Sequence, residues 1–236
     1  MKQLSSLLVI TASAAFAQPP QPFSGAVSGI LKGEDGTLIA GGAILLHLTR
    51  PPTSKFVQQR TDWSAATAAG GVFQFTGLPE GTYTVCPHVR NSTWLGPCEW
   101  NLPTPTATIS RSSANASVTI TLKRGAAVPI RIDDAGQLLT RHEGRTPGAG
   151  LLLSVSGPGL FFRLVPLVSQ DSNGRNYQIV IPFGTALTLV VHPSFYHVNN
   201  ASGVALSQGR STKIPLLVGA GQQVPPFTFT ISGAGP

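Results

Sequence analysis

The sequence predicts an all-β protein made of two tandem β-sandwich domains that follow a cleaved signal peptide. Composition is the first reason: the 236 residues include 26 Gly and 20 Pro, and only 11% are charged. Short strands joined by turns use such a composition, whereas helices favour Ala, Leu, Glu and Lys. The other two reasons are a strand pattern that recurs after about one hundred residues and a two-residue alternation of apolar side chains. We therefore expect almost no helix after the signal peptide.

The N-terminus has the features of an export signal. Lys2 precedes an apolar stretch at residues 7–10, and a small-x-small cleavage pattern follows at residues 15–17. Residues 1–17 are therefore predicted to be removed, and the mature chain begins near Gln18. The stretch is shorter than the about 20 residues of a transmembrane helix, and no cysteine follows the cleavage pattern to carry a lipid. We expect a secreted or periplasmic protein with no membrane span and no lipid anchor.

The first half contains a series of predicted strands separated by turn residues. Residues 26–31 form the first strand, and the turn at 32–36 leads to a second strand within 41–49. Residues 71–85 contain two strands with a Pro-x-Gly turn between them. The closing strand, 117–124, alternates Val, Ile and Leu with Thr and Lys, which indicates one buried face. Several short strands of this kind predict two sheets that bury their inner faces against each other.

The second half repeats this order of elements. A strand at 127–132 runs into the Asp-Asp-Ala-Gly turn of 133–136, and a strand within 148–156 follows. Residues 174–191 again contain a strand, a Pro-x-Gly turn and a return strand, and an alternating strand at 227–232 closes the half. The predicted units are a signal peptide (1–17), a first sandwich (18–124) and a second, diverged sandwich (125–236).

A motif between residues 67 and 85 accounts for the packing of the first half. Phe73 and Phe75 share one face of a strand, the turn follows at 79–81, and the next Tyr and Val return to the core. The positions that define the motif are Gly71, Phe73, Phe75, Leu78, Pro79, Gly81, Tyr83 and Val85. A Gly-Ala-Ile-Leu-Leu strand at 42–46 precedes it.

With these motifs, residues 24–123 resemble the carboxypeptidase regulatory-like domain family, a prealbumin-like sandwich that is grouped with carbohydrate-binding-like folds. Ala68 stands where the family usually has Asp, and Ala186 lies near the place of the motif Tyr in the second half, which we regard as a diverged copy. The resemblance implies accessory modules without catalysis of their own, attached to peptidases, outer-membrane receptors or surface proteins. A fold analogy cannot name a ligand.

The two cysteines, Cys86 and Cys98, predict a disulfide, because an even and closely spaced pair in an exported chain usually forms one. The bridge would contribute roughly 2–3 kcal/mol by restricting the unfolded chain. It would also fix the shape of the loop between the two residues. A metal site would need four ligands, and the sole imidazole nearby is that of His88.

Known metal and nucleic-acid motifs are not matched. The chain has a formal net charge of +7, but its basic residues are scattered and no basic run interleaves with aromatic residues, so we predict no nucleic-acid partner. His192 and His197 are five apart without a nearby acidic ligand, and we interpret them as exposed loop histidines. Residues 171–174 lack the distal Glu of a calcium loop, and we interpret them as a hairpin turn.

Catalytic motifs are also missing, so we predict no enzyme, no catalytic residue, no metal and no cofactor. No Gly-x-Ser-x-Gly elbow occurs in the sequence. Glu34 with Asp35, and Asp133 with Asp134, are adjacent pairs that we interpret as turn residues rather than as paired catalytic carboxylates. A cryptic hydrolase would require histidines and carboxylates that converge in a cleft.

Three tryptophans are the candidate ligand-binding residues. Trp94 lies inside the predicted disulfide loop, Trp100 just beyond it, and Trp63 in a predicted loop before Thr67. Aromatic rings on fixed loops can stack on sugars, although the same rings can simply cover the edge of a sandwich. The sequence thus predicts a non-catalytic exported binding or accessory module, with a glycan or a cell-surface protein as partner. The alternative is a purely structural or protein-interaction spacer.

Overall fold

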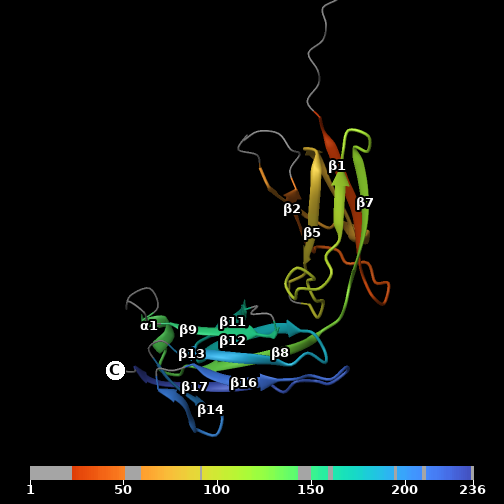
Figure 1. The fold of residues 1–236 in the computed structure, drawn as a ribbon. Helices are drawn as coiled ribbons and strands as arrows, with labels where there is room; N and C mark the ends of the chain where they lie inside the picture. Colours follow the sequence, from red (N-terminus) through yellow and green to blue (C-terminus); the bar gives the residue numbers. More distant parts are fainter. Residues whose placement is uncertain are drawn as a thin grey trace, which may run out of the picture.

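The computed structural model describes residues 23–50, 60–90, 92–142, 150–158, 162–193, 196–208 and 211–234. The predicted signal peptide, residues 1–17, lies outside the described residues. The described residues form four β-sheets, which confirms the predicted all-β class. Figure 1 shows two lobes, one built from β1 to β7 and the other from β8 to β17, whose strands run in different directions. Within these ranges no helix is long and apolar enough to cross a membrane.

The strands of the first lobe follow the predicted turns closely. They are β1 (Gly25–Gly33), β2 (Ala43–Arg50), β3 (Asp62–Ala66), β4 (Val72–Leu78), β5 (Gly81–His88), β6 (Thr106–Ile109) and β7 (Asn115–Leu122), with the 3-10 helix η1 (Ala69–Gly71) before β4. One sheet has the order β4-β1-β7, and the other has the order β3-β2-β5-β6. β1 pairs antiparallel with β4 and parallel with β7, so the first and last strands of the lobe are neighbours.

The core of the first lobe lies between its two sheets. The motif residues Phe73, Phe75, Tyr83 and Val85 are all buried in it, as the alternation predicts. The Tyr83 hydroxyl donates a hydrogen bond of 2.6 Å to the carbonyl oxygen of Pro79, which ties the β5 core position to the turn before it. The motif is therefore a packing motif.

The second lobe has more strands than the first. They are β8 (Ala126–Asp133), β9 (Leu151–Ser156), β10 (Phe162–Leu164), β11 (Leu167–Asp171), β12 (Gly174–Ile181), β13 (Leu187–Pro193), β14 (Tyr196–Asn200), β15 (Ala205–Gln208), β16 (Thr212–Leu216) and β17 (Phe227–Ala234), with the helix α1 (Leu138–His142) after β8. A six-stranded sheet has the order β11-β12-β8-β17-β14-β15, and a four-stranded sheet has the order β10-β9-β13-β16.

The repeat in the sequence is also a repeat of strand topology. β8 pairs antiparallel with β12 and parallel with β17, as β1 does with β4 and β7. The antiparallel series β9-β13-β16 likewise corresponds to β2-β5-β6. The second lobe adds β11 to one edge of its larger sheet and β14 with β15 to the other.

Turns in the second lobe agree with the sequence in one place and differ in another. Asp171 pairs with Gly174 across the predicted hairpin between β11 and β12. Asp133, predicted as a turn residue, instead ends β8, whereas Asp134 begins the predicted turn, where its carbonyl oxygen accepts a 2.8 Å hydrogen bond from the N–H of Gln137. The Asp134 side chain is buried. The Asp134 carboxylate accepts hydrogen bonds from the N–H groups of Leu138 (2.7 Å) and Leu139 (2.9 Å), because the first N–H groups of a helix have no acceptor within it.

Candidate binding cleft

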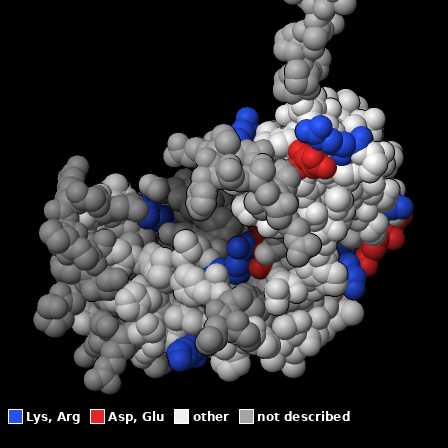
Figure 2. Space-filling model, turned by 45° about the horizontal axis from the view of Figure 1, so that its top comes forward, with Lys and Arg blue, Asp and Glu red and all other residues white. Residues whose placement is uncertain are grey.

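A cleft of about 760 Å³ lies between the two lobes. One wall is the segment from His88 to Trp100, which follows β5, and the other is the edge of the second lobe formed by β10, β11 and β12. Figure 2 shows Lys and Arg side chains, with Asp or Glu beside them, where the two parts of the molecule meet. Clefts of about 300–1,000 Å³ at domain junctions are common ligand sites.

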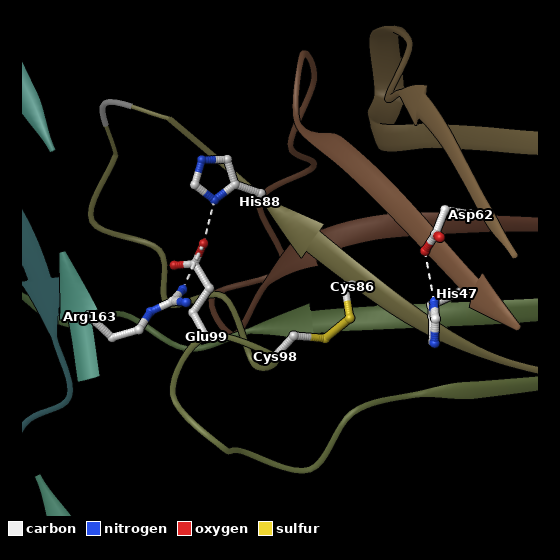
Figure 3. Close-up of a disulfide and its surroundings, with 7 residues drawn as sticks. All are labelled: His47, Asp62, Cys86, His88, Cys98, Glu99 and Arg163. Carbon is white, nitrogen blue, oxygen red and sulfur yellow. Dashed lines mark hydrogen bonds and ion pairs between the residues drawn. A yellow bond between two sulfur atoms is a disulfide. The ribbon is translucent and has the colours of Figure 1, made fainter. Parts of the chain in front are cut away.

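The first wall is shaped by the predicted disulfide, which the structure contains. Cys86 of β5 is bonded to Cys98, and their Cα atoms lie 5.6 Å apart (Figure 3). Inside the loop, the N–H of Leu95 donates a 2.9 Å hydrogen bond to the carbonyl of Lys123, at the end of the first lobe. The loop is therefore held at both its base and its middle, beside the connection to the second lobe.

Two side chains of this loop region belong to the core of the second lobe. Leu95 is 3% exposed and Trp100 is 7% exposed, and both are part of the buried cluster that contains Val128, Ile181 and Leu187. Burying a side chain of this size stabilises a protein by roughly 1.5–3 kcal/mol. The contact between the lobes is consequently apolar.

A polar group spans the cleft beside this apolar contact. One carboxylate oxygen of Glu99, Oε1, lies 2.6 Å from Nδ1 of His88 and 3.1 Å from a guanidinium nitrogen of Arg163. Figure 3 shows the Arg163 side chain extending from its strand in the second lobe toward Glu99 in the loop. Because all three side chains are partly exposed, the ion pair positions the walls more than it stabilises the fold.

Arg124, the middle one of the three residues between β7 and β8, is fixed by the first lobe. Its guanidinium lies 4.2 Å from the centre of the Trp94 ring and donates hydrogen bonds to Asp35 (2.8 Å) and to Thr93 (3.1 Å). Its backbone N–H donates to Glu34 at 2.9 Å. The short connection between the lobes is thus held at its middle residue by contacts with four neighbouring residues.

The electrostatics of this junction favour an ionised Asp35. The N–H of Thr37 and the guanidinium of Arg124 hydrogen-bond to its carboxylate and lower its pKa to about 2. Asp35 is therefore negatively charged at neutral pH, when it pairs with Arg124. Glu34 and Asp35 occupy the turn after β1, as predicted, and they also anchor the connection between the lobes.

The second wall exposes an unusual amount of apolar surface. The edge residues Phe162, Leu164, Leu167 and Val168 line the cleft and are between 49% and 58% exposed. Val165, between them, is buried. We call these four exposed side chains the apolar rim. Contiguous exposed apolar side chains next to polar groups are typical of binding surfaces.

The structure brings together two of the three tryptophans predicted to bind a ligand. Trp94 and Trp100 line the cleft, although Trp100 is almost fully buried. Trp63 was predicted on a loop, and this is wrong: it lies in β3, where its ring meets Tyr83 at 5.6 Å and lies below Arg60. The reason is that β3 pairs with β2, and in this sheet the Trp63 side chain packs against the core of the first lobe.

The histidines do not converge. The loop position predicted for His192 and His197 is wrong, because His192 lies in β13 and His197 in β14, in different sheets. His192 contacts Ser211 at 2.6 Å, and His47 of β2 contacts Asp62 of β3 at 2.7 Å (Figure 3). Within the described parts of the chain, no group of three or more His, Cys, Asp or Glu residues could hold a metal ion.

Sequence reasoning missed the residues of the second wall. Residues 162–168 read Phe-Arg-Leu-Val-Pro-Leu-Val and do not alternate apolar with polar side chains. Such a run is not typical of a strand with one solvated face. That departure was the available signal. Glu99 and Arg163 carried no signal, since their pairing depends on how the lobes pack.

Comparisons with known proteins give distant similarities. No protein-family model matches the chain, and no curated protein matches it. Among solved structures, a streptococcal ancillary pilin is 12% identical with a TM-score of 0.39; the match covers 88% of this chain and 63% of the pilin, so the chain spans less than two thirds of it. GBS52, a minor pilin of Streptococcus agalactiae, is also 12% identical, with a TM-score of 0.39 over 88% of this chain and 95% of that one. The shaft pilin SpaA of Lactobacillus rhamnosus GG is 10% identical, with a TM-score of 0.34 over 90% of this chain and 100% of that one. Similarities at these scores say nothing about the function of this chain.

Proposed function

We propose that this chain is a non-catalytic binding module of the cell exterior that takes its ligand in the cleft between the lobes. The observation that carries the proposal is the cleft itself, with its apolar rim and the polar group of His88, Glu99 and Arg163. Ligand sites of this kind combine mostly apolar walls with a few polar groups that fix orientation. The resemblance to carboxypeptidase regulatory-like domains supports the same role, because those domains are accessory.

The walls favour a ligand with apolar groups over a neutral sugar. A sugar would need an aromatic ring face, and Arg124 lies over one face of Trp94, while Trp100 is almost fully buried. The exposed area comes instead from the apolar rim. A carbohydrate ligand, which the tryptophans suggested, therefore has less support from the geometry than an apolar ligand.

Binding on two arrays tests the proposal. The protein would be applied to a glycan array and to a peptide array, beside Leu164→Ser in the rim and Leu217→Ser as control. Both leucines are well exposed, at 58% and 66%, so neither change should unfold the protein, and Leu217 does not line the cleft. We expect binding on at least one array that Leu164→Ser removes and Leu217→Ser keeps. No binding on either array, or binding that Leu164→Ser leaves intact, would refute the cleft as the site.

A second candidate function is that of a rigid spacer, which the fixed position of Arg124 favours. A spacer requires lobes that keep one arrangement. Small-angle X-ray scattering of the wild type and Arg124→Ala measures this directly: for a spacer we expect one compact arrangement in the wild type and a broader distribution of dimensions in the variant. Equal distributions would remove the support that Arg124 gives to this candidate.

A further inference from the structure

We propose that the partner in the cleft is an extended peptide segment that adds to the free edge of β11 and places alternate apolar side chains against the apolar rim. This inference rests on the proposed binding function and names its ligand class. It follows from three features of the second wall: an open backbone edge, a bulge beside it, and the charge around it.

The open edge is the first feature. β11 pairs with β12 on one side, and among the described residues no strand pairs with its other side. All five residues of β11 are exposed. An edge strand presents unpaired N–H and C=O groups, which are a template for another extended chain.

The edge lacks the side chains that usually protect it. Charged side chains and prolines block many natural edges, and residues 167–170, Leu-Val-Ser-Gln, contain neither. The one charge, Asp171, is engaged by both terminal nitrogens of the Arg131 guanidinium, at 2.6 and 3.0 Å. The edge is thus uncharged along the part that faces the cleft.

A bulge directs two successive side chains into the cleft. The pairing of β11 with β12 shifts register between Leu167 and Ser169. Successive side chains of a regular strand point to opposite faces, and a bulge interrupts that alternation and can re-aim a side chain. Leu167 and Val168 accordingly both line the cleft, beside Leu164. A peptide on this edge would meet apolar contacts as well as backbone hydrogen bonds.

The charge of the cleft selects for an acidic group on the peptide. Arg90 lines the cleft, is exposed, and forms no salt bridge with a described carboxylate. Arg163 is a second guanidinium in the lining of the cleft, whereas the lining residues include a single carboxylate, that of Glu99, which pairs with Arg163. Guanidinium groups bind carboxylates with two parallel hydrogen bonds. We therefore expect an Asp, a Glu or a terminal carboxylate next to the apolar residues of the peptide.

The test uses a random phage-displayed peptide library panned on the whole protein. Enriched peptides would be synthesised and their affinity measured for the wild type, for Val168→Ser, and for Val204→Ser as control. Val168 and Val204 are similarly exposed, at 52% and 59%, and only Val168 lines the cleft. Each peptide would also be methylated at one backbone nitrogen at a time, which removes a strand hydrogen bond without changing the side chain.

The expected result has three parts. First, apolar residues alternate along the enriched peptides, which also carry an acidic residue. Second, Val168→Ser weakens the affinity for these peptides about tenfold, while Val204→Ser leaves it unchanged. Third, N-methylation weakens the affinity about tenfold at every second position of the peptide. Hydrogen exchange of the β11 amides should slow when the peptide is bound. Peptides that tolerate N-methylation at every position, or that bind Val168→Ser as well as the wild type, would overturn strand addition.

Other occupants of the cleft give distinct outcomes. Glycan binding that Leu164→Ser removes, without any enriched peptide, would leave the binding function standing and overturn this inference. A dimer of the chain that Val168→Ser dissociates would also overturn it, since the occupant would then be a second copy. If neither array nor library yields a ligand that depends on the cleft, both the inference and the proposed function fail.

Discussion

Removing the disulfide should destabilise both lobes, although both cysteines belong to the first. The perturbation is the double substitution Cys86→Ser and Cys98→Ser. The bridge closes a loop with a sequence separation of 12, and the chain-entropy relation gives about 2.8 kcal/mol at 25 °C for a loop of that length. In most loops, removing a disulfide would affect only the lobe that contains it. Here the loop region carries Leu95 and Trp100 into the core of the second lobe, so its loosening also removes apolar contacts there.

Tryptophan fluorescence can follow this effect, because the second lobe has no tryptophan of its own. With Trp63→Phe and Trp94→Phe in both proteins, the emission of Trp100 reports whether it is docked in the second core. With the bridge we expect blue-shifted emission. Without it we expect red-shifted emission, or a free energy of unfolding, measured in urea, that is lower by about 2.8 kcal/mol. Circular dichroism checks that the strands remain.

One result would refute the reasoning. The Trp100 emission, and the unfolding transition that it reports, could be the same with and without the bridge. The docking of the loop would then not depend on the disulfide. The two lobes would then be held together by their other contacts alone.

Three further predictions concern single side chains. The Thr37 N–H and the Arg124 guanidinium lower the pKa of Asp35 to about 2, so its ionised form stabilises the fold above pH 3.8 and this contribution is lost as the pH falls toward 2. Arg124→Ala should raise that pKa in an NMR titration, and an unchanged value would contradict the pairing. Burial raises the pKa of Tyr83 to about 12, so stability that depends on its neutral form is present below pH 10 and declines toward pH 12. The absorbance difference between the wild type and Tyr83→Phe should show a phenol that ionises near pH 12. A phenol that ionises near pH 10 would contradict the burial of Tyr83. Asp134→Ala should cost about 1–2 kcal/mol in urea denaturation, because two N–H groups of α1 lose their acceptor, and no measurable loss would contradict the cap.

The parts of the fold that could be predicted are those set by neighbours in the sequence. The two strands and turn of residues 71–85 follow from local alternation and from a Pro-x-Gly turn, and the bridge between Cys86 and Cys98 follows from their spacing. The location of Trp63 and the burial of Trp100 could not be predicted, because they depend on which strands and lobes meet.

The candidate site shows the same limit. Trp94 was found because its ring type and its disulfide loop stand out locally. The second wall, residues 162–168, was missed because its exposure results from a sheet edge, and no local pattern states which strand of a sheet lies at the edge. Likewise, the role of Glu99 depends on Arg163 arriving from the other lobe.

The parallel pairing of β1 with β7 determines how this protein bears mechanical load. Force applied to the two ends of the first lobe pulls these neighbouring strands in opposite directions along their length, so the ladder is sheared and its bonds must break together. The ladder runs from Ala26 opposite Asn115 to Gly33 opposite Leu122. The corresponding ladder of β8 and β17 is shorter, from Ile130 opposite Phe227 to Asp133 opposite Thr230. In single-molecule pulling we expect two ruptures, with the second lobe failing at the lower force, so that under tension the lobe that forms the apolar rim opens first.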